Sequence, residues 1–301
     1  MIAKYLKTEQ LSNRVIYTHF ELFFVVTIWA GTFVATKIVL EEISPALSAL
    51  YRYCIASFIL LVIDYKNPER IKPADYPLVI FLGATGVTFY YLLQHFGINY
   101  TNATDAAILV SLSPVFIGII SLVLLGEKLK GAAIIGLVLA FWGCILVIAN
   151  GSIGFHDNKE RFWGDLLILL TAVSWALYSV YGKKLLKIYS ILTIVKYTTW
   201  IGTLLLIPFS LFEMLHTTIR YCPSITGWLN LIYLGGLASV YGYLAWYRAL
   251  NKLPAVTVGS YLYFRPLLTG IISAIVLHET IGVFVIVGGF LIIIGTYLST
   301  R

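Results

Sequence analysis

Arg265 lies about halfway along residues 255–277, an apolar stretch long enough to cross a membrane. A guanidinium at that depth costs about 2.5 to 3.5 kcal/mol on insertion scales unless it is paired. Its partner could be an internal carboxylate, backbone carbonyls freed by the neighbouring Pro266, or a carboxylate or phosphate on a bound small molecule. Arg52, near the start of the apolar residues 46–64, raises the same question. Both arginines are therefore candidate ligand-binding residues, with a structural ion pair as the alternative.

Carboxylates are scarce in the apolar stretches, and we expect none at mid-depth. Asp105 and Glu127 lie near opposite ends of residues 103–125, and Glu279 ends the stretch that contains Arg265. A cavity with Arg265 and no deep carboxylate favours an anionic or zwitterionic ligand over a purely cationic one. We expect Glu127 and Glu279 to orient helix ends or to act as gates, and Asp105 is a candidate for carrying a coupling proton.

Aromatic side chains recur at positions that could line a central site. Tyr91 and Gln94 are three residues apart and so share one helix face, as do Tyr243 and Trp246 further along the chain. The further candidates are Trp29, Trp175, Tyr178, Tyr261 and Tyr263. The alternative is ordinary packing, because Trp and Tyr are enriched at membrane interfaces and 15% of the chain is aromatic.

His95 follows Gln94 directly. A single histidine at the end of a membrane span is most simply an interfacial residue with its hydrogen bonds satisfied. Proton coupling is the alternative, because imidazole titrates near neutral pH.

Two prolines lie near the middle of apolar stretches. Pro114 and Pro266 each lack the amide hydrogen that an α-helix needs, which frees the carbonyls of Val110 and Leu262. Such a break can serve as a hinge or as a ligand site. Alternatively, it can be a simple kink whose freed carbonyls accept hydrogen bonds from neighbouring helices. Because the break occurs in both halves of the chain, we predict a role in a conformational change.

The elements that carry these residues are predicted to be membrane-spanning helices. Apolar residues make up 59% of the 301-residue chain and charged residues 12%, with a mean hydropathy of +0.89, far from the values of soluble domains. Ten stretches are long and apolar enough to span a bilayer: residues 19–40, 46–64, 77–97, 103–125, 131–149, 163–182, 190–212, 226–247, 255–277 and 281–298. The expected fold class is all-α, in contact with a lipid bilayer.

The basic residues follow the predicted topology. Fourteen of the 21 Lys and Arg residues fall on one side of the membrane and three on the other. By the positive-inside rule both termini of this multi-pass chain are predicted to be cytoplasmic, in the cell membrane. The same distribution argues against nucleic acid as a partner, despite the net charge of +7. We expect Lys196, close to the inner end of its span, to reach toward the membrane surface.

The chain is an internal duplication. Twelve of the 41 residues from Ala103 to Gly143 recur identically 152 positions later, and Trp29-Ala30 recurs 146 positions later as Trp175-Ala176. Each copy has five predicted spans, an odd number, so the two copies should have opposite orientations in the membrane. The predicted organisation is a cytoplasmic segment (1–18), a first repeat (19–149), a linker (150–162) and a second repeat (163–298).

These features resemble the EamA-type branch of the drug/metabolite transporter superfamily. The resemblance rests on the doubled five-span unit, the early Trp-Ala, the proline in the fourth span, and the sequence GEKL at 126–129 matched by HETI at 278–281. One departure is His278, where the first copy has Gly126. The resemblance implies a transporter of small molecules and leaves the substrate open, since the family includes carriers of amino acids, vitamins, nucleotide-like metabolites and drugs.

The expected function is a secondary transporter that moves small polar metabolites by alternating access, most simply an exporter of amino acids or related compounds. Uptake of a vitamin, nucleoside or nucleotide derivative is the alternative within transport. An intramembrane enzyme is the alternative of another class, but the sequence has no protease, zinc-helix or P-loop motif. We expect no metal and no cofactor. A coupling proton is a possible partner, and the sequence does not predict an oligomeric state.

Overall fold

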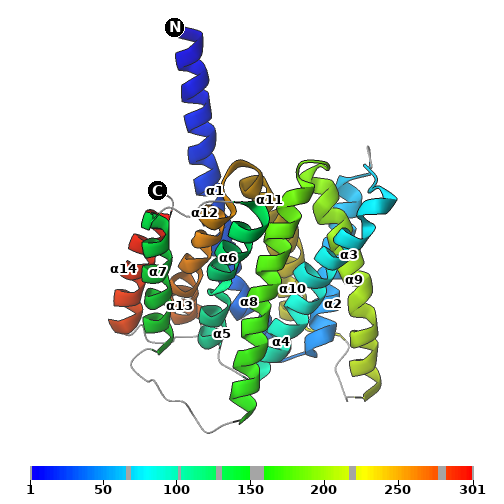
Figure 1. Ribbon diagram of the computed structural model, residues 1–301. Helices are drawn as coiled ribbons and strands as arrows, with labels where there is room; N and C mark the ends of the chain where they lie inside the picture. The colour runs from blue at the N-terminus through cyan, green and yellow to red at the C-terminus, as the bar shows by residue number, and fades with distance from the viewer. Residues whose placement is uncertain are drawn as a thin grey trace.

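The structure is a computed structural model, and it describes residues 2–65, 69–100, 103–126, 131–149, 159–216, 222–276 and 283–299. Helices are the only regular secondary structure in this described part of the chain (Figure 1). The first half contains α1 (Ile2–Leu40), α2 (Pro45–Ile63), η1 (Pro73–Asp75), α3 (Tyr76–Gly83), η2 (Ala84–Phe89), α4 (Tyr90–Tyr100), α5 (Ala103–Val110), α6 (Ser113–Leu125) and α7 (Gly131–Ala149). The second contains α8 (Lys159–Leu185), α9 (Ile191–His216), α10 (Ile225–Ile232), η3 (Tyr233–Tyr241), α11 (Gly242–Lys252), α12 (Ala255–Ser260), η4 (Tyr261–Tyr263), α13 (Phe264–Val276) and α14 (Val283–Ser299).

Six helical segments of the described residues are long and apolar enough to cross a membrane. They are Ile16–Leu40, Pro45–Ile63, Pro73–Tyr100, Trp163–Leu185, Ile191–His216 and Ala255–Val276. The outer surface of the bundle carries many large apolar side chains, among them Val123 and Leu215, which are about 80% exposed. A contiguous apolar surface of this kind needs a lipid environment. The chain is therefore an all-helical, multi-pass membrane protein.

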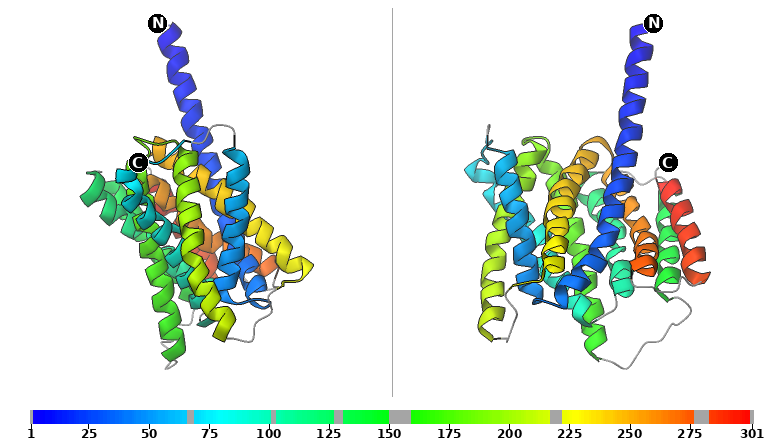
Figure 2. Two further views of the ribbon diagram at one scale, coloured as in Figure 1. Left: turned by 90° about the vertical axis from the view of Figure 1, so that its right-hand side faces the viewer. Right: turned by 180° about the vertical axis from the view of Figure 1, so that it is seen from behind.

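The remaining four predicted spans correspond to helices that are short, interrupted or only partly described. Residues 103–125 divide into α5 and α6, and residues 226–247 fall on α10, η3 and α11. The end of α1 at Ile2 extends beyond the predicted span, and Figure 1 shows this part of the helix projecting from the bundle. Both chain termini lie toward the same end of the molecule (Figures 1 and 2).

Helix α7 packs against α14 at one edge of the bundle, and α2 packs against α9 toward the other (Figures 1 and 2). Glycines make the first of these contacts close. A Cβ atom on Gly143 would lie 2.6 Å from the carbonyl oxygen of Gly288, and one on Gly295 would lie 2.5 Å from that of Gly136. The missing side chains at these positions therefore let the two helices approach closely.

The two prolines stand at helix breaks. The chain leaves the α-helix at residues 111–112, and α6 restarts with Pro114 in its first turn. The hydroxyl of Ser113 donates a hydrogen bond to the carbonyl oxygen of Val110 at 2.5 Å, which satisfies the acceptor that the break frees. In the second half, the short 3₁₀ segment Tyr261–Tyr263 separates α12 from α13, and Pro266 lies in the first turn of α13.

Two π-helical segments, which the sequence did not predict, interrupt matching helices of the two halves. They are η2 (Ala84–Phe89) and η3 (Tyr233–Tyr241), and they overlap when the chain is shifted by 152 residues. In a π-helix the backbone bonds run from residue i to i+5, so the helix is wider and its carbonyls point in new directions. The two segments flank the centre of the bundle.

Candidate functional site

A small cavity lies at the centre of the bundle. Its walls are formed by Trp29 and Thr32 of α1, Arg52 of α2, Tyr90, Tyr91 and Gln94 of α4, Trp175 of α8 and Arg265 of α13. Its volume is about 10 Å³, which is about the space of one water molecule. Five helices from both halves of the chain thus meet at one site that contains two guanidinium groups.

Arg52 is fixed by protein contacts. It is 2% exposed, its Nε donates to the hydroxyl of Ser239 at 2.8 Å, and one terminal nitrogen donates to the Tyr91 hydroxyl at 2.9 Å. Its guanidinium also lies 4.2 Å from the centroid of the Tyr91 ring. Neutral hydroxyls and an aromatic face therefore hold this arginine, and no described carboxylate forms a salt bridge with it.

Arg265 is buried as well, but it has fewer partners. Its guanidinium carbon lies 5.4 Å from the Trp29 ring centroid and 5.8 Å from that of Phe33. In the described part of the chain, its buried Nε has no hydrogen-bond partner and no carboxylate pairs with it. An internal carboxylate was one of the partners for Arg265 that the sequence left open. The described residues provide no such carboxylate.

Aromatic rings pack closely around the cavity, at edge-to-face or tilted angles. Trp29 and Trp175 are repeat-related, and their ring centroids are 5.2 Å apart with planes at 87°. Trp246 lies 5.3 Å from Trp29 and 5.4 Å from Trp175. Tyr90 covers another side of Trp175 at 5.3 Å. Such contacts are favourable beyond the area that they bury, so they stabilise the walls of the cavity.

The π-helical segments position several of these side chains. Tyr243 donates its hydroxyl hydrogen to the carbonyl oxygen of Gly86 in η2, at 2.8 Å. Trp29 donates its indole hydrogen to the carbonyl oxygen of Ala238 in η3, at 2.9 Å. Gly86 and Ala238 are 152 residues apart, so matching positions of the two halves supply the two acceptors. These unusual backbone segments orient the aromatic rings of the site, a role that π-helices often have in functional regions.

Six of the ten predicted substrate-binding residues line the cavity: Trp29, Arg52, Tyr91, Gln94, Trp175 and Arg265. The other four, Tyr178, Tyr243, Trp246 and Tyr263, are buried but are not part of its wall. Tyr178, Tyr243 and Trp246 pack behind Trp175. Sequence reasoning missed Thr32 and Tyr90. Thr32 is three residues after Trp29, and that helical spacing was the available signal.

The comparison with known proteins identifies the family. The model of the EamA-like transporter family matches residues 18–149 and again residues 162–301. The chain belongs to the EamA-like transporter family. An uncharacterised transporter of Archaeoglobus fulgidus is 35% identical to it over 94% of this chain and 97% of its own length.

Two other relatives bear on substrate and fold. A protein of Streptantibioticus cattleyicolor named as a probable terminal-alkyne amino-acid exporter is 29% identical to this EamA-like chain, over 92% of the chain and 91% of the relative. A solved crystal structure matches with a TM-score of 0.78 at 18% identity, over 94% of this chain and 98% of its own. That second likeness concerns the fold alone.

His95 differs from the simplest expectation for a residue at a span end. It is fully buried, its Nδ1 lies 3.2 Å from the carbonyl oxygen of Pro45, and its Nε2 has no partner among the described residues. It stands edge to face with Tyr91 at 5.7 Å. The interpretation of His95 as an interfacial residue is therefore wrong, and its role in proton coupling stays a prediction.

The predicted roles of the carboxylates are untested. Glu127 and Glu279 lie outside the described residues, and Asp105 lies on α5 with a side chain that is not described. The hinge role of Pro114 and Pro266 also stays a prediction, although both mark breaks in the EamA-like fold.

Lys196 corrects another expectation. It does not reach the membrane surface, because it is 1% exposed and forms a salt bridge of 2.5 Å with Asp64, at the end of α2. The Tyr197 ring lies 4.6 Å from the Lys196 ammonium. Asp64, which the sequence analysis did not include, supplies the counter-charge for the buried ammonium.

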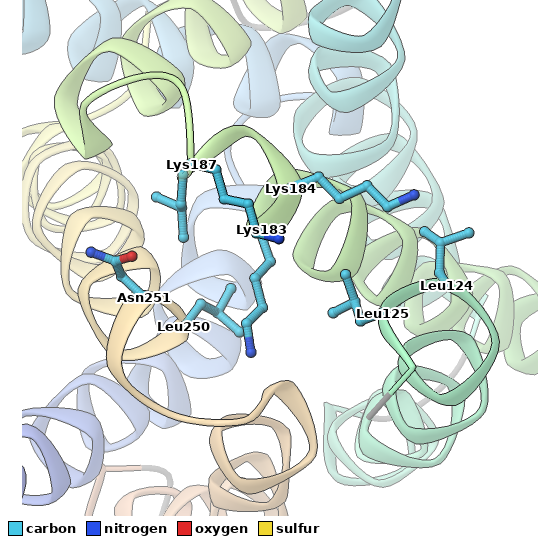
Figure 3. A pocket seen from close by; sticks show the side chains of 8 residues that line it. Leu124, Leu125, Lys183, Lys184, Lys187, Leu250 and Asn251 are labelled. Carbon is cyan, nitrogen blue, oxygen red and sulfur yellow. The ribbon is translucent and has the colours of Figure 1, made fainter. Parts of the chain in front are cut away.

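A larger cavity, of about 500 Å³, opens between α6, α8 and α11 at the end of the bundle that carries the termini. Figure 3 shows Leu124 and Leu125 on one side and Leu250 and Asn251 on the other. Lys183, Lys184 and Lys187 lie between them, in the last turn of α8 and the turn that follows. This mouth is basic, and it lies on the side that the charge pattern predicts to be cytoplasmic.

Proposed function

We propose that this EamA-like chain is a secondary transporter of small polar metabolites that carry a carboxylate, foremost amino acids and related compounds, and that it exports them. The observation that carries the proposal is the central cavity. It has two buried guanidinium groups in its wall and no carboxylate from the described residues. An anionic group on the substrate compensates Arg265, which is otherwise costly at this depth.

The transporter has ten spans in the cell membrane, arranged as two inverted five-span repeats over residues 19–149 and 163–298. Support comes from the paired features of the two halves. A π-helical segment occurs in the third predicted span of each half, and a helix break occurs in the fourth. Both termini lie at one end of the bundle (Figure 1), as an even number of crossings requires, and both are cytoplasmic under the positive-inside rule.

Transport follows an alternating-access cycle in which the two repeats rock around the central cavity. The breaks at Pro114 and Pro266 act as hinges, because a broken helix can bend without losing a continuous ladder of hydrogen bonds. The basic mouth of Figure 3 is the cytoplasmic entry, where lysines attract anionic substrates from the cell interior.

Export rather than uptake is supported by the Streptantibioticus cattleyicolor relative, which is named a probable terminal-alkyne amino-acid exporter. Direction is testable, because reconstituted protein can be loaded from either side. A vitamin or nucleotide derivative that competes better than any amino acid would favour the uptake alternative.

The variant Arg265→Gln tests the substrate site. In proteoliposomes it should abolish counterflow of amino acids that the wild type transports, while its melting temperature in detergent stays near that of the wild type. The expectation follows from the lack of an ion pair, since the substitution leaves no described carboxylate without a partner. Loss of folded protein instead would make Arg265 a structural residue, and unchanged transport would remove it from the site.

A further inference from the structure

Two buried hydrogen-bond donors in the wall of the central cavity have no acceptor among the described residues. They are the indole Nε1 of Trp175 and Nε of Arg265. As whole residues, Trp175 is 2% exposed and Arg265 is 4% exposed. Buried donors are nearly always paired in native proteins, so an unpaired one calls for an explanation. Here there are two, and both belong to residues that line the same small space.

Other tryptophans of the chain make the contrast clear. The indole nitrogen of Trp29 donates to Ala238, that of Trp246 donates to the Ser179 hydroxyl at 3.1 Å, and that of Trp200 donates to the carbonyl oxygen of Ser57 at 3.2 Å. The fold therefore provides acceptors for indole groups in comparable surroundings. Trp175 differs because its indole nitrogen has no such acceptor among the described residues, although it lines the same cavity as Arg265.

The second arginine of the cavity shows the same contrast. Arg52 donates to Ser239 and to Tyr91, so its Nε is occupied. Arg265 has an open Nε, and its guanidinium packs on the Trp29 ring, which also contacts Trp175 at 5.2 Å. Trp29 thus contacts both residues that have an open donor. Arg52 instead holds Tyr91 in place and acts as a positioning residue.

We propose that Trp175 Nε1 and Arg265 Nε together form the cradle that binds the carboxylate of the transported substrate, one oxygen to each donor. This inference rests on the proposed transport function and adds the group that the site recognises. Two open donors match the two oxygens of a carboxylate, with one donor charged and one neutral. A phosphate carries a further oxygen and a higher charge, so inorganic phosphate is a probe that distinguishes the two anions in the test below.

Thermal-shift titrations on the detergent-purified full chain test the cradle. The probes are the twenty protein amino acids, with acetate, benzoate and succinate as carboxylates without an amine, inorganic phosphate, and the C-terminal amide of each amino acid that binds. A ligand that binds only the folded state raises its melting temperature. We expect carboxylates to bind the wild type and the matching amides to bind at least about tenfold more weakly, which is the loss of one hydrogen bond to a charged group.

Trp175→Phe keeps an aromatic ring and removes the open donor. It should weaken the Kd of the best carboxylate by about tenfold or more. Trp200→Phe is the matched control, because it makes the same change at an indole whose partner is Ser57, outside the cavity; it should leave the Kd unchanged. Arg265→Lys is the second variant. It keeps the charge and removes Nε, and it should weaken the same carboxylate while leaving the protein folded.

Several results would overturn the cradle. They are the absence of binding by every carboxylate probe, equal binding of acid and amide, tighter binding of phosphate than of any carboxylate, or a Trp175→Phe variant with wild-type affinity. Counterflow of the same probes by the wild type is measured separately. Transport with an unaffected Trp175→Phe variant refutes the cradle and leaves the carrier, whereas carboxylate binding without transport refutes the carrier and leaves the cradle.

Discussion

At the scale of single residues, the structure separates two ways of keeping a cation within the membrane. Lys196 has a carboxylate partner in Asp64, and both side chains are buried. Arg52 and Arg265 have hydroxyls and aromatic faces instead. A charge with a counter-ion in the protein has a structural role, whereas a charge without one can attract an anionic ligand. This difference distinguishes the central cavity, the proposed substrate site, from the α2–α9 contact.

The pair between Lys196 and Asp64 gives a prediction of stability. Asp64→Asn leaves the Lys196 ammonium buried without a counter-charge, which should lower the free energy of unfolding by about 3 to 5 kcal/mol. The measurement is thermal or denaturant unfolding of purified protein. The double variant Asp64→Leu with Lys196→Met removes both charges and should recover most of the loss. A single variant as stable as the wild type would show that water reaches Lys196.

At the scale of elements, α2 and α9 cap each other. The amides of Ala46 and Leu47, at the start of α2, donate to Glu213 Oε2 near the end of α9, at 2.9 and 3.3 Å. The amide of Ser190, just before α9, donates to Glu69 Oε2 after the end of α2, at 3.0 Å. A carboxylate at a helix N-terminus satisfies open amides and interacts favourably with the helix dipole. The same device thus joins the two helices at both ends.

Removing the charge of either capping carboxylate should cause a small loss of stability that depends on pH. Glu213→Gln and Glu69→Gln should each cost about 0.5 to 1 kcal/mol near neutral pH. The hydroxyl of Thr193, with further hydrogen bonds from Ser190, holds the pKa of Glu69 below its ordinary value. A carboxylate with a lowered pKa stabilises the fold above the pKa of the unfolded state, and that contribution is lost as the pH falls through the folded-state pKa.

Melting curves of wild type and Glu69→Gln between pH 7 and pH 3 check this cap. The difference between the two proteins should shrink below about pH 4, because an unfolded glutamate titrates near that value. A difference that grows toward low pH would contradict the assignment of Glu69 as a charged cap.

The elements also show how far the sequence could lead. Repeat-related prolines predicted the helix breaks, because proline acts locally on its own helix. The π-helical segments Ala84–Phe89 and Tyr233–Tyr241 were not predicted, since their widening has no comparable signal in residue type. They set which way Trp29 and Tyr243 point. The ring of Trp246 is not part of the cavity wall, although its repeat mate Gln94 lines the cavity.

At the scale of the whole molecule, the duplication explains how two similar halves of the chain can build one asymmetric site. Trp29 and Trp175 occupy matching positions, yet the indole of Trp29 is bonded to Ala238 and that of Trp175 is open. Arg265 replaces Ser113 of the first repeat, whose hydroxyl bonds to Val110. The repeat supplies the frame, and single differences between its copies supply the polar groups of the cavity. The matching tryptophans could be found in the sequence. The unpaired hydrogen-bond donors could not, because the neighbouring helices decide whether a donor finds an acceptor.

The orientation of the molecule gives a last prediction, which uses a native cysteine. Cys222 is a free, exposed thiol three residues before α10. The start of α10 lies toward the end of the bundle opposite the termini (Figure 2). Under the proposed topology this end faces the outside of the cell. A membrane-impermeant maleimide should therefore label Cys222 in intact cells, and Cys222→Ser should abolish the signal. Cys54 is also exposed, but it lies on α2 within a membrane span, where a charged reagent has no water through which to reach it. Labelling that requires permeabilised cells would place Cys222 inside, and it would reverse the orientation of both repeats and of the basic mouth.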